Sequence, residues 1–569
     1  MRGADPGALR SEALAAERSG RHDLAAHRLQ ELENAGEATV ADRLRHALNR
    51  LLAGDPAAAE AALTGAVVAG AAPGHADLVA AQIAIRTSNW ARLAATARGR
   101  LQRAPNDEQA REHLSRALLE QGDLDAAAEA FRPLTNSTSP LSLERALIYG
   151  QLCLHAQRFD EARDMLSRAA QDPKSGRART ALARLATFEG RFEDAEALCR
   201  EAIRLEPDNP RGYQQLSVVR RGDVDDAVRS ALERFWSGPP GEAALEHAGI
   251  GFTLADIAFR RGEAEKALHL YQQANEMRRA AFVETGFEFS AEATRARFAK
   301  LLAAYEALPA PPRPSDDAPR PIFIVGPPRS GTTLFESIIG AHPDATACGE
   351  VSAGPRVLDD FERQLGAEGV GSVAEIVSRN AARWRETYLD ASPGRHFRRT
   401  GVFTDKMPGN AIAAPLLKRL FPTARFIVTR RAPFDVAVSI LRHQFPGAYD
   451  WAHGLDNIAT FLELQDAFIA RLIEQAPDDF AVIDYDELVE RPDNGRRALA
   501  AAAGLSWDDA CLDHTRRTGP VATFSSVQVR KSISAGTSDG GRLFRPLLAD
   551  YADHLEARIA AARRGDAAH

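Results

Sequence analysis

A short phrase recurs through the first three hundred residues and restricts what this part of the chain can fold into. It contains a glycine, or a polar residue in that place, then Asp or Arg, then small alanines, as in QGDLDAAAEA at Gly122 and EGRFEDAEAL at Gly190. Glycine ends one helix, and the alanines allow the next helix to pack closely against it. The phrase therefore predicts a repeated helix–turn–helix unit. Further copies occur at Gly20, Gly54, Asn89, Arg158, Gly222 and Gly262.

The spacing of these copies indicates a known architecture. Most steps between them are 32 to 35 residues, and the last step is 40 residues. A period of about 34 residues is typical of tetratricopeptide repeats, in which pairs of antiparallel helices stack into a solenoid. We therefore predict an all-α solenoid of about eight units over residues 1–277. It either binds a peptide or protein on its concave face, or supports or oligomerises the domain that follows; both interpretations stay open.

A domain boundary is predicted after the repeats. Residues 278–308 continue the helical pattern, and residues 309–319 contain five prolines. Such a segment is a stiff connector. We therefore assign residues 278–320 to a helical extension with a proline-rich linker, and residues 321–569 to a further domain.

Charge and composition exclude several classes of partner. The net charge is −7 and the pI is near 6.1, so the chain as a whole does not attract nucleic acid or an anionic membrane. The sequence has neither the apolar core of a signal peptide nor an apolar run of about 18 residues, which predicts a cytoplasmic protein. Its 4 cysteines are far apart and are predicted to be reduced thiols. An anion site in this chain would need a local group of arginines.

Residues 321–341 predict such an anion site. Ile322 to Val325 form an apolar, β-branched run that ends at Gly326, as a buried parallel strand does. A turn follows, and helical spacing begins at Leu334. In a strand–loop–helix unit of this kind, loop amides and the positive end of the helix converge on an anion.

The loop is not that of an ordinary nucleotide triphosphatase. Gly326, Gly331 and Thr333 fit the Walker A pattern, but Thr332 stands where that pattern has lysine. Arg329 is the only cation in the loop. An atypical P-loop kinase is therefore a poor interpretation, because the lysine that reaches the β- and γ-phosphates is missing.

Three further strands are predicted after this loop, near residues 403–405, 424–429 and 481–485, with helices between them. Strands that alternate with helices indicate a parallel sheet with ligands at the carboxyl ends of its strands. Lys406 and Arg431 follow two of these strands, so we expect both to share a cleft with Arg329.

The loop resembles a known family. PPRSGTTL at residues 327–334, followed by AHPD and GE, is similar to the sulfotransferases that use 3′-phosphoadenosine 5′-phosphosulfate. Among these it most resembles the tyrosylprotein sulfotransferases and bacterial relatives fused to helical repeats, over about residues 321–551. The resemblance implies an α/β P-loop-like sulfotransferase domain with a parallel sheet, placed after the all-α tetratricopeptide-type solenoid. It also implies a donor chemistry that needs no metal.

The resemblance assigns roles to residues of the loop and beyond. The donor's 5′-phosphosulfate is implied to bind Arg329, Ser330, Gly331, Thr332 and Thr333. Glu350 falls where the tyrosylprotein enzymes have their catalytic base. Lys406 matches a lysine that steadies the bridging oxygen as the leaving group departs. Asp405 would orient Lys406 or pair with it.

Other matches concern the nucleotide. Arg431 and Ser439 have the spacing that holds the donor's 3′-phosphate in the family, and Arg430 is a competing candidate because neighbouring strand residues face opposite sides. Tyr485 matches a tyrosine near the nucleotide. Lone histidines such as His443 are interpreted as structural.

A segment near the C-terminus resembles the family's SS-x-QV sequence, which lies over the donor. Ser525 would be a catalytic hydroxyl near the sulfuryl group. Ser526, Gln528 and Lys531 would contact the donor, and Arg542 would lie close to the 3′-phosphate.

Two functions from different classes follow. The first is a sulfotransferase that acts on a hydroxyl acceptor; a protein tyrosine is one candidate, and a saccharide, lipid or small phenol fits the same residues. The acceptor would be a protein or peptide if the repeats bind it. The alternative is a helical-repeat interaction protein whose sulfotransferase-like domain binds nucleotide without turnover.

Overall fold

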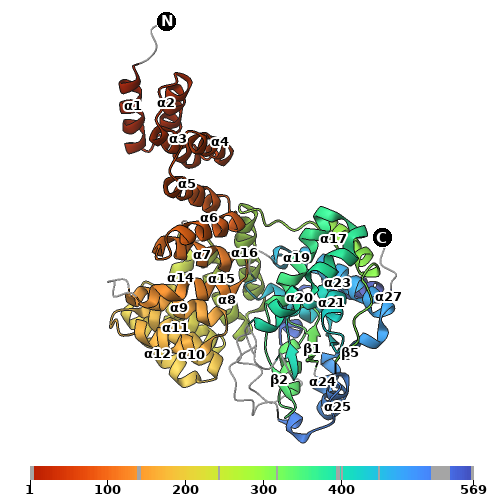
Figure 1. Cartoon of the computed structure of the whole chain (residues 1–569). Helices are drawn as coiled ribbons and strands as arrows, with labels where there is room; N and C mark the ends of the chain where they lie inside the picture. The colour runs from red at the N-terminus through yellow and green to blue at the C-terminus, as the bar shows by residue number, and fades with distance from the viewer. Residues whose placement is uncertain are drawn as a thin grey trace. The chain divides into compact units, whose positions relative to one another are not determined.

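Figure 1 shows the computed structural model of the chain. The structure describes residues 5–136, 142–240, 244–315, 318–391, 398, 401–445, 449–513 and 539–564. The chain divides into two compact units, Met1–Arg145 and Ala146–His569. Helices of the first unit are α1 (Pro6–Arg18), α2 (His22–Asn34), α3 (Val40–Leu52), α4 (Pro56–Val68), α5 (Pro73–Arg86), α6 (Trp90–Arg103), α7 (Glu108–Glu120) and α8 (Leu124–Phe131).

The predicted turns are present at the predicted places. Gly20, Gly54 and Gly122 have φ values of +71°, +87° and +75°, which glycine adopts without steric cost. Where the phrase has no glycine, Ser88 takes the left-handed conformation with φ +50°. The turn geometry is therefore kept even where the sequence lacks the residue that favours it.

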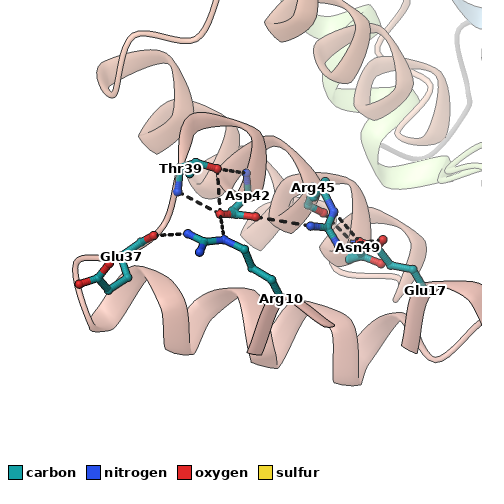
Figure 2. A network of polar contacts seen from close by, with 7 residues as sticks. All are labelled: Arg10, Glu17, Glu37, Thr39, Asp42, Arg45 and Asn49. Atoms are coloured by element: carbon teal, nitrogen blue, oxygen red, sulfur yellow. Dashed lines mark hydrogen bonds and ion pairs between the residues drawn. The ribbon is translucent and has the colours of Figure 1, made fainter. Parts of the chain in front are cut away.

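A polar network joins α1 to α3 in the first unit (Figure 2). Asp42 is 4% exposed and accepts hydrogen bonds from Arg10 Nε (2.9 Å) and from the Thr39 hydroxyl (2.8 Å). These partners lower the pKa of Asp42 against the effect of its burial. Glu17 accepts from Asn49 Nδ2 at 2.7 Å. The hydrogen bonds from Arg10 to Asp42 and from Asn49 to Glu17 join α1 to α3, so we interpret this network as a tie between repeats.

The second unit begins with further repeat helices. They are α9 (Ser142–His155), α10 (Phe159–Ala169), α11 (Gly176–Glu189), α12 (Phe192–Leu205), α13 (Pro210–Arg220), α14 (Asp226–Ser237), α15 (Ala244–Arg260) and α16 (Ala264–Val283). In the turn between α9 and α10 the left-handed residue is Gln157, with φ +56°.

An α/β domain follows helix α17 (Ala291–Glu306). Its strands are β1 (Arg320–Val325), β2 (Ala345–Ala347), β3 (Val402–Asp405), β4 (Arg425–Arg430) and β5 (Phe480–Asp484). All pairings are parallel, in the order β2-β3-β1-β4-β5. The four longer strands lie where the sequence predicts them. β2 has three residues and was not predicted.

Helices cover both faces of this sheet. The longer ones are α18 (Thr332–Ile339), α19 (Ala353–Glu368), α20 (Val373–Asp390), α21 (Asn410–Leu420), α22 (Pro433–Leu441), α23 (Leu455–Gln475), α25 (Pro492–Ala502) and α27 (Ala549–Arg564), and the short ones are α24 (Tyr485–Glu490) and α26 (Asp539–Phe544). Side chains of β1 alternate between two cores: Phe323 packs with α19 to α23, and Ile324 packs with α18, α24 and α25. Figure 1 shows α20 and α21 on one side of β1, with α24 and α25 on the other.

The last repeat helices pack directly on the α/β domain. Asn275 of α16 is 1% exposed and donates to the backbone carbonyl of Leu441 at 2.7 Å. Arg278 donates to the carbonyl of Phe445 at 2.6 Å. Carbonyls at the end of a helix have no partner within the helix, so α16 caps the C-terminal end of α22. The repeats before the proline-rich segment and the α/β domain after it therefore share one hydrophobic core. The domain boundaries predicted from the sequence stay a prediction.

Replacing Asn275 with alanine is expected to lower the free energy of unfolding by about 1–3 kcal/mol, because the buried carbonyl of Leu441 loses its donor. Chemical denaturation followed by tryptophan fluorescence would measure this. Asn34→Ala, which removes an exposed asparagine at the end of α2, is the matched control and should leave the denaturation midpoint unchanged. An unchanged denaturation midpoint for Asn275→Ala would contradict the capping role.

Candidate active site

The site lies where the topology of the sheet reverses. The chain leaves β1 toward β2 and β3, and it leaves β4 toward β5 on the opposite side. Ligands of open parallel sheets bind in the crevice at such a point, outside the carboxyl ends of the strands. The loop after β1 and the residues after β4 border this crevice.

Two glycines give the loop its shape. Gly326 has φ +133°, and a Cβ there would lie 2.8 Å from the Thr429 carbonyl oxygen. Gly331 has φ +102°, and a Cβ there would lie 2.2 Å from the ring of Tyr485. Both positions therefore require glycine, and the Tyr485 ring lies directly against the loop.

The hydroxyl residues of the loop are buried, and the Ser330 hydroxyl is hydrogen-bonded. The Ser330 hydroxyl donates to the Pro327 carbonyl at 2.7 Å and also contacts the Thr429 hydroxyl. Thr332 and Thr333 form the first turn of α18 and are buried. The amides of this first turn have no partner within the helix, so they are available to an anion.

Arg329 lies between the loop and α22. Its backbone has φ +70°, and its Nε donates to the Ser439 hydroxyl at 3.0 Å. Burial, followed by the nearby Arg431 and Arg442 cations, lowers the pKa of Arg329 to about 10. The charged form of Arg329 is disfavoured by this environment, and a bound anion would stabilise it.

Arg431 completes this group. Its Nη1 donates to the Arg329 carbonyl at 3.2 Å, and its guanidinium lies 4.7 Å from the centre of the Tyr485 ring. Its Nε is buried and has no hydrogen-bond partner among the residues that the structure describes. Arg430 faces the other side, near Asp466 and Arg563, and burial lowers its pKa. The geometry therefore favours Arg431 over Arg430 as the anion ligand.

Glu350 and Lys406 form an ion pair beside the loop. The Lys406 side chain is 1% exposed and that of Glu350 is 37% exposed. The Lys406 backbone amide also donates to the Gly349 carbonyl at 2.8 Å. Asp405 does not pair with Lys406 within the described part of the chain. Of the two roles predicted for Asp405, only the orientation of Lys406 through the backbone is left.

Two buried carboxylates fix the backbone on either side of Glu350. The Gly349 amide donates to Glu336 Oε1 at 2.7 Å, and the Val351 amide donates to Asp405 Oδ1 at 3.2 Å. The Tyr388 hydroxyl and the Asn410 amide both donate to Asp405 Oδ2 at 2.8 Å. Burial raises the pKa of Asp405 to about 6. The position of the Glu350 main chain is therefore set from both sides.

Two ranges of the chain match models of known protein families. Residues 321–509 match the model of the sulfotransferase family, and residues 143–217 match a tetratricopeptide repeat model. Residues 321–509 form a sulfotransferase-family domain. The predicted fold class, a tetratricopeptide-type solenoid followed by a sulfotransferase domain with a parallel sheet, is confirmed.

Several curated proteins are similar to the chain. It is 25% identical to an uncharacterized protein of Aquifex aeolicus over 434 residues, which cover 73% of this chain and 54% of that protein. It is 25% identical to protein-tyrosine sulfotransferase 1 of Danio rerio over 219 residues, 37% of this chain and 60% of the relative. It is 28% identical to the nodulation protein NoeE of Sinorhizobium fredii over 223 residues, 34% of this chain and 52% of that protein. The chain thus spans little more than half the length of these curated relatives.

Solved structures also resemble its parts. The sulfotransferase domain of the Synechococcus olefin synthase is 20% identical, with a TM-score of 0.30, and the match covers 44% of this chain and 98% of that domain. A tetratricopeptide repeat protein of Parabacteroides merdae is 17% identical, with a TM-score of 0.35, over 42% of this chain and 93% of that protein.

Not every predicted site residue can be placed in the sulfotransferase domain. Ser525, Ser526, Gln528 and Lys531 lie outside the described residues. Arg542 is exposed on α26, which packs against α22. Within the described ranges, we find no group of three or more His, Cys, Asp or Glu side chains that could hold a metal ion. A search of the same residues for a membrane-spanning helix found none.

Sequence reasoning missed residues that act on the site from a distance. Glu336 is a buried charge in an otherwise apolar helix, and that contrast in LFESII is a signal that the sequence contains. Asn275, which caps the helix that carries Ser439, gives no such signal, since polar residues are common on repeat helices. His443, interpreted as structural, contacts the Ser439 carbonyl through Nδ1 at 2.6 Å.

Proposed function

We propose that this chain transfers a sulfuryl group from 3′-phosphoadenosine 5′-phosphosulfate to a hydroxyl acceptor. The observation that carries the proposal is the Arg431 Nε, a buried donor without a partner in the described residues, beside the Arg329–Ser439 contact. A buried cationic donor without a partner is costly. A bound anion at this place would remove that cost.

The two phosphate-bearing ends of the donor would occupy different parts of the crevice. The 5′-phosphosulfate would lie on the loop amides and on the first turn of α18, as anions do at helix N-termini. The 3′-phosphate would lie between Arg431 and Ser439 and would distinguish this donor from ATP. Arg329, which contacts Ser439 and the Arg431 guanidinium, would connect the two parts.

The reaction itself needs a base and a stabilised leaving group. The acceptor oxygen forms a bond to sulfur while the bond between sulfur and the bridging phosphate oxygen breaks. Glu350 would take the acceptor proton, and adenosine 3′,5′-bisphosphate would leave with the electron pair. Lys406 and Arg329 would stabilise the charge that develops on this leaving group.

The ion pair between Lys406 and Glu350 fits this scheme. It brings the proposed base and the proposed leaving-group cation into direct contact. The phosphosulfate would bring a competing anion to Lys406, and Glu350 would then face the acceptor hydroxyl.

Titration calorimetry tests the nucleotide assignment. We expect adenosine 3′,5′-bisphosphate to bind more tightly than adenosine 5′-monophosphate and ATP. Arg431→Ala is expected to reduce the preference over the monophosphate by about 10- to 100-fold, since a hydrogen bond to a charged group contributes about 1.5–3 kcal/mol. Arg430→Ala, the neighbour that faces away, is the matched control. Tighter binding of ATP by the unaltered protein would refute the proposal.

Labelled donor tests the transfer and the acceptor class. We would offer the protein a tyrosine-containing peptide, 2-naphthol and a hydroxylated saccharide, and follow label from 3′-phosphoadenosine 5′-[³⁵S]phosphosulfate. Transfer to any of them supports the enzyme. Tight nucleotide binding without transfer to any of them would favour the interaction protein with an inactive domain.

A further inference from the structure

The turn between α9 and α10 differs from most turns of the solenoid. Among the described residues, four that carry side chains have positive φ: Ser88, Gln157, Arg221 and Arg329. Arg329 belongs to the anion loop, and Gln157 contacts the segment that carries the proposed base. Residues with side chains are disfavoured in this conformation, and such strain tends to occur at functional sites. The glutamine at this turn is therefore a candidate for a role beyond folding.

The contact of Gln157 is with Glu350 itself. Its side-chain amide Nε2 donates to the backbone carbonyl of Glu350 at 3.5 Å, across 193 residues of sequence. This distance is longer than the usual N–H···O range of about 2.7–3.2 Å, so the contact is a weak hydrogen bond. Both residues belong to the second compact unit, so the contact lies within one body.

The turn that presents Gln157 is itself firmly held. Arg158 Nε donates to Glu161 Oε1 at 2.6 Å, and the Tyr149 hydroxyl donates to Glu161 Oε2 at 2.9 Å. Backbone amides of Gln157 and Arg158 donate to carbonyls at the end of α9, at 3.2 and 2.8 Å. The glutamine amide therefore extends from a fixed base, as a group that positions another residue needs to do.

The contact gives the Glu350 carbonyl a donor that the described residues of the sulfotransferase domain do not provide. The backbone amides on either side of Glu350 donate hydrogen bonds to two buried carboxylates, those of Glu336 and Asp405. The carbonyl of Glu350 is held instead by the repeat turn. The peptide group between Glu350 and Val351 thus has two partners: Gln157 of the repeats at its carbonyl and Asp405 of the sulfotransferase domain at its amide.

We propose that Gln157 is a positioning residue for Glu350, so that the repeat region completes the active site on the acceptor side. This inference rests on the proposed function, in which Glu350 takes the acceptor proton. Gln157 fixes the peptide unit from which the carboxylate extends, and an acceptor hydroxyl that reaches Glu350 lies beside the α9–α10 turn. The solenoid then acts directly in transfer, whatever else it binds.

Gln157→Gly separates this role from a role in folding. Glycine suits φ +56° better than glutamine does, so the thermal unfolding temperature should stay the same or rise. The affinity for adenosine 3′,5′-bisphosphate should also stay the same. The kcat for the best acceptor of the three-member panel should fall about tenfold or more, because small misplacements of a catalytic group have effects of this size. A purely structural residue would change stability and kcat in the same direction.

Two further variants complete the experiment. Ser88→Gly makes the same change in a turn of the first unit and should leave kcat unchanged. Gln157→Glu keeps the length of the side chain but cannot donate when ionised, and it should lower kcat as Gln157→Gly does. If both Gln157 variants fold and keep kcat within about twofold of the unaltered protein, the inference is wrong while the proposed function stands. If the unaltered protein transfers label to none of the three acceptors, both are overturned.

Discussion

Replacing Glu350 with glutamine is expected to slow sulfuryl transfer by about 10²- to 10⁴-fold, the range that general-base catalysis contributes. Glutamine keeps the shape of the side chain and still accepts a hydrogen bond from Lys406, so the fold should be unchanged. Adenosine 3′,5′-bisphosphate should bind with nearly the same affinity, because Glu350 is assigned to the acceptor and not to the nucleotide. Transfer of label from the sulfated donor and calorimetry would measure the two quantities separately.

Glu375→Gln, on the exposed first turn of α20, is the control for loss of one carboxylate. It should leave transfer and binding unchanged. If Glu350→Gln abolished nucleotide binding with the fold preserved, Glu350 would be part of the nucleotide site and the assignment as base would be wrong.

Lys406→Ala is expected to have an effect of similar size, about 10²- to 10³-fold on turnover, because a preorganised donor at developing charge contributes about 3–4 kcal/mol. The lysine is almost completely buried, and its ammonium group contacts Glu350. Arginine should not restore turnover, since its planar fork is longer and does not fit a site built around a compact ammonium group. Rapid-quench measurement of a single turnover would isolate the chemical step from product release.

The matched control for this variant is Lys418→Ala. Lys418 is half-buried on α21 and pairs with Asp479 at 2.7 Å, away from the anion loop. Its loss should affect stability more than turnover. Equal turnover in Lys406→Ala and the unaltered protein would exclude Lys406 from the stabilisation of the leaving group.

The parts of the fold that could be predicted are those with local causes. The strand at Ile322–Val325, the glycines at 326 and 331, and the helix that follows are encoded within about twenty adjacent residues. The turns of the solenoid were predictable because each depends on one phrase. β2 was missed because three residues of mixed polarity carry no strand pattern, and its pairing with β3 decides it.

The site divides in the same way. Arg431 and Ser439 were named because the resemblance to the sulfotransferases implies them, and the structure shows both in contact with Arg329. The hydrogen bonds that Glu336 and Asp405 accept from the amides beside Glu350 join residues 13 and 54 positions apart in the sequence. The contact from Gln157 spans 193 residues. A local sequence pattern carries no information on contacts between residues so far apart. The roles of these residues could therefore be found only from the structure.

The cap that α16 places on α22 has a consequence for engineering this protein. Exchanging the solenoid for that of a relative by cutting at the proline-rich segment would remove Asn275 and Arg278 and expose the carbonyls of Leu441 and Phe445. A chimera joined ahead of α9 would instead retain α16 with Asn275 and Arg278, and so both contacts. Exchange of repeats is therefore better attempted ahead of α9 than with the whole helical region.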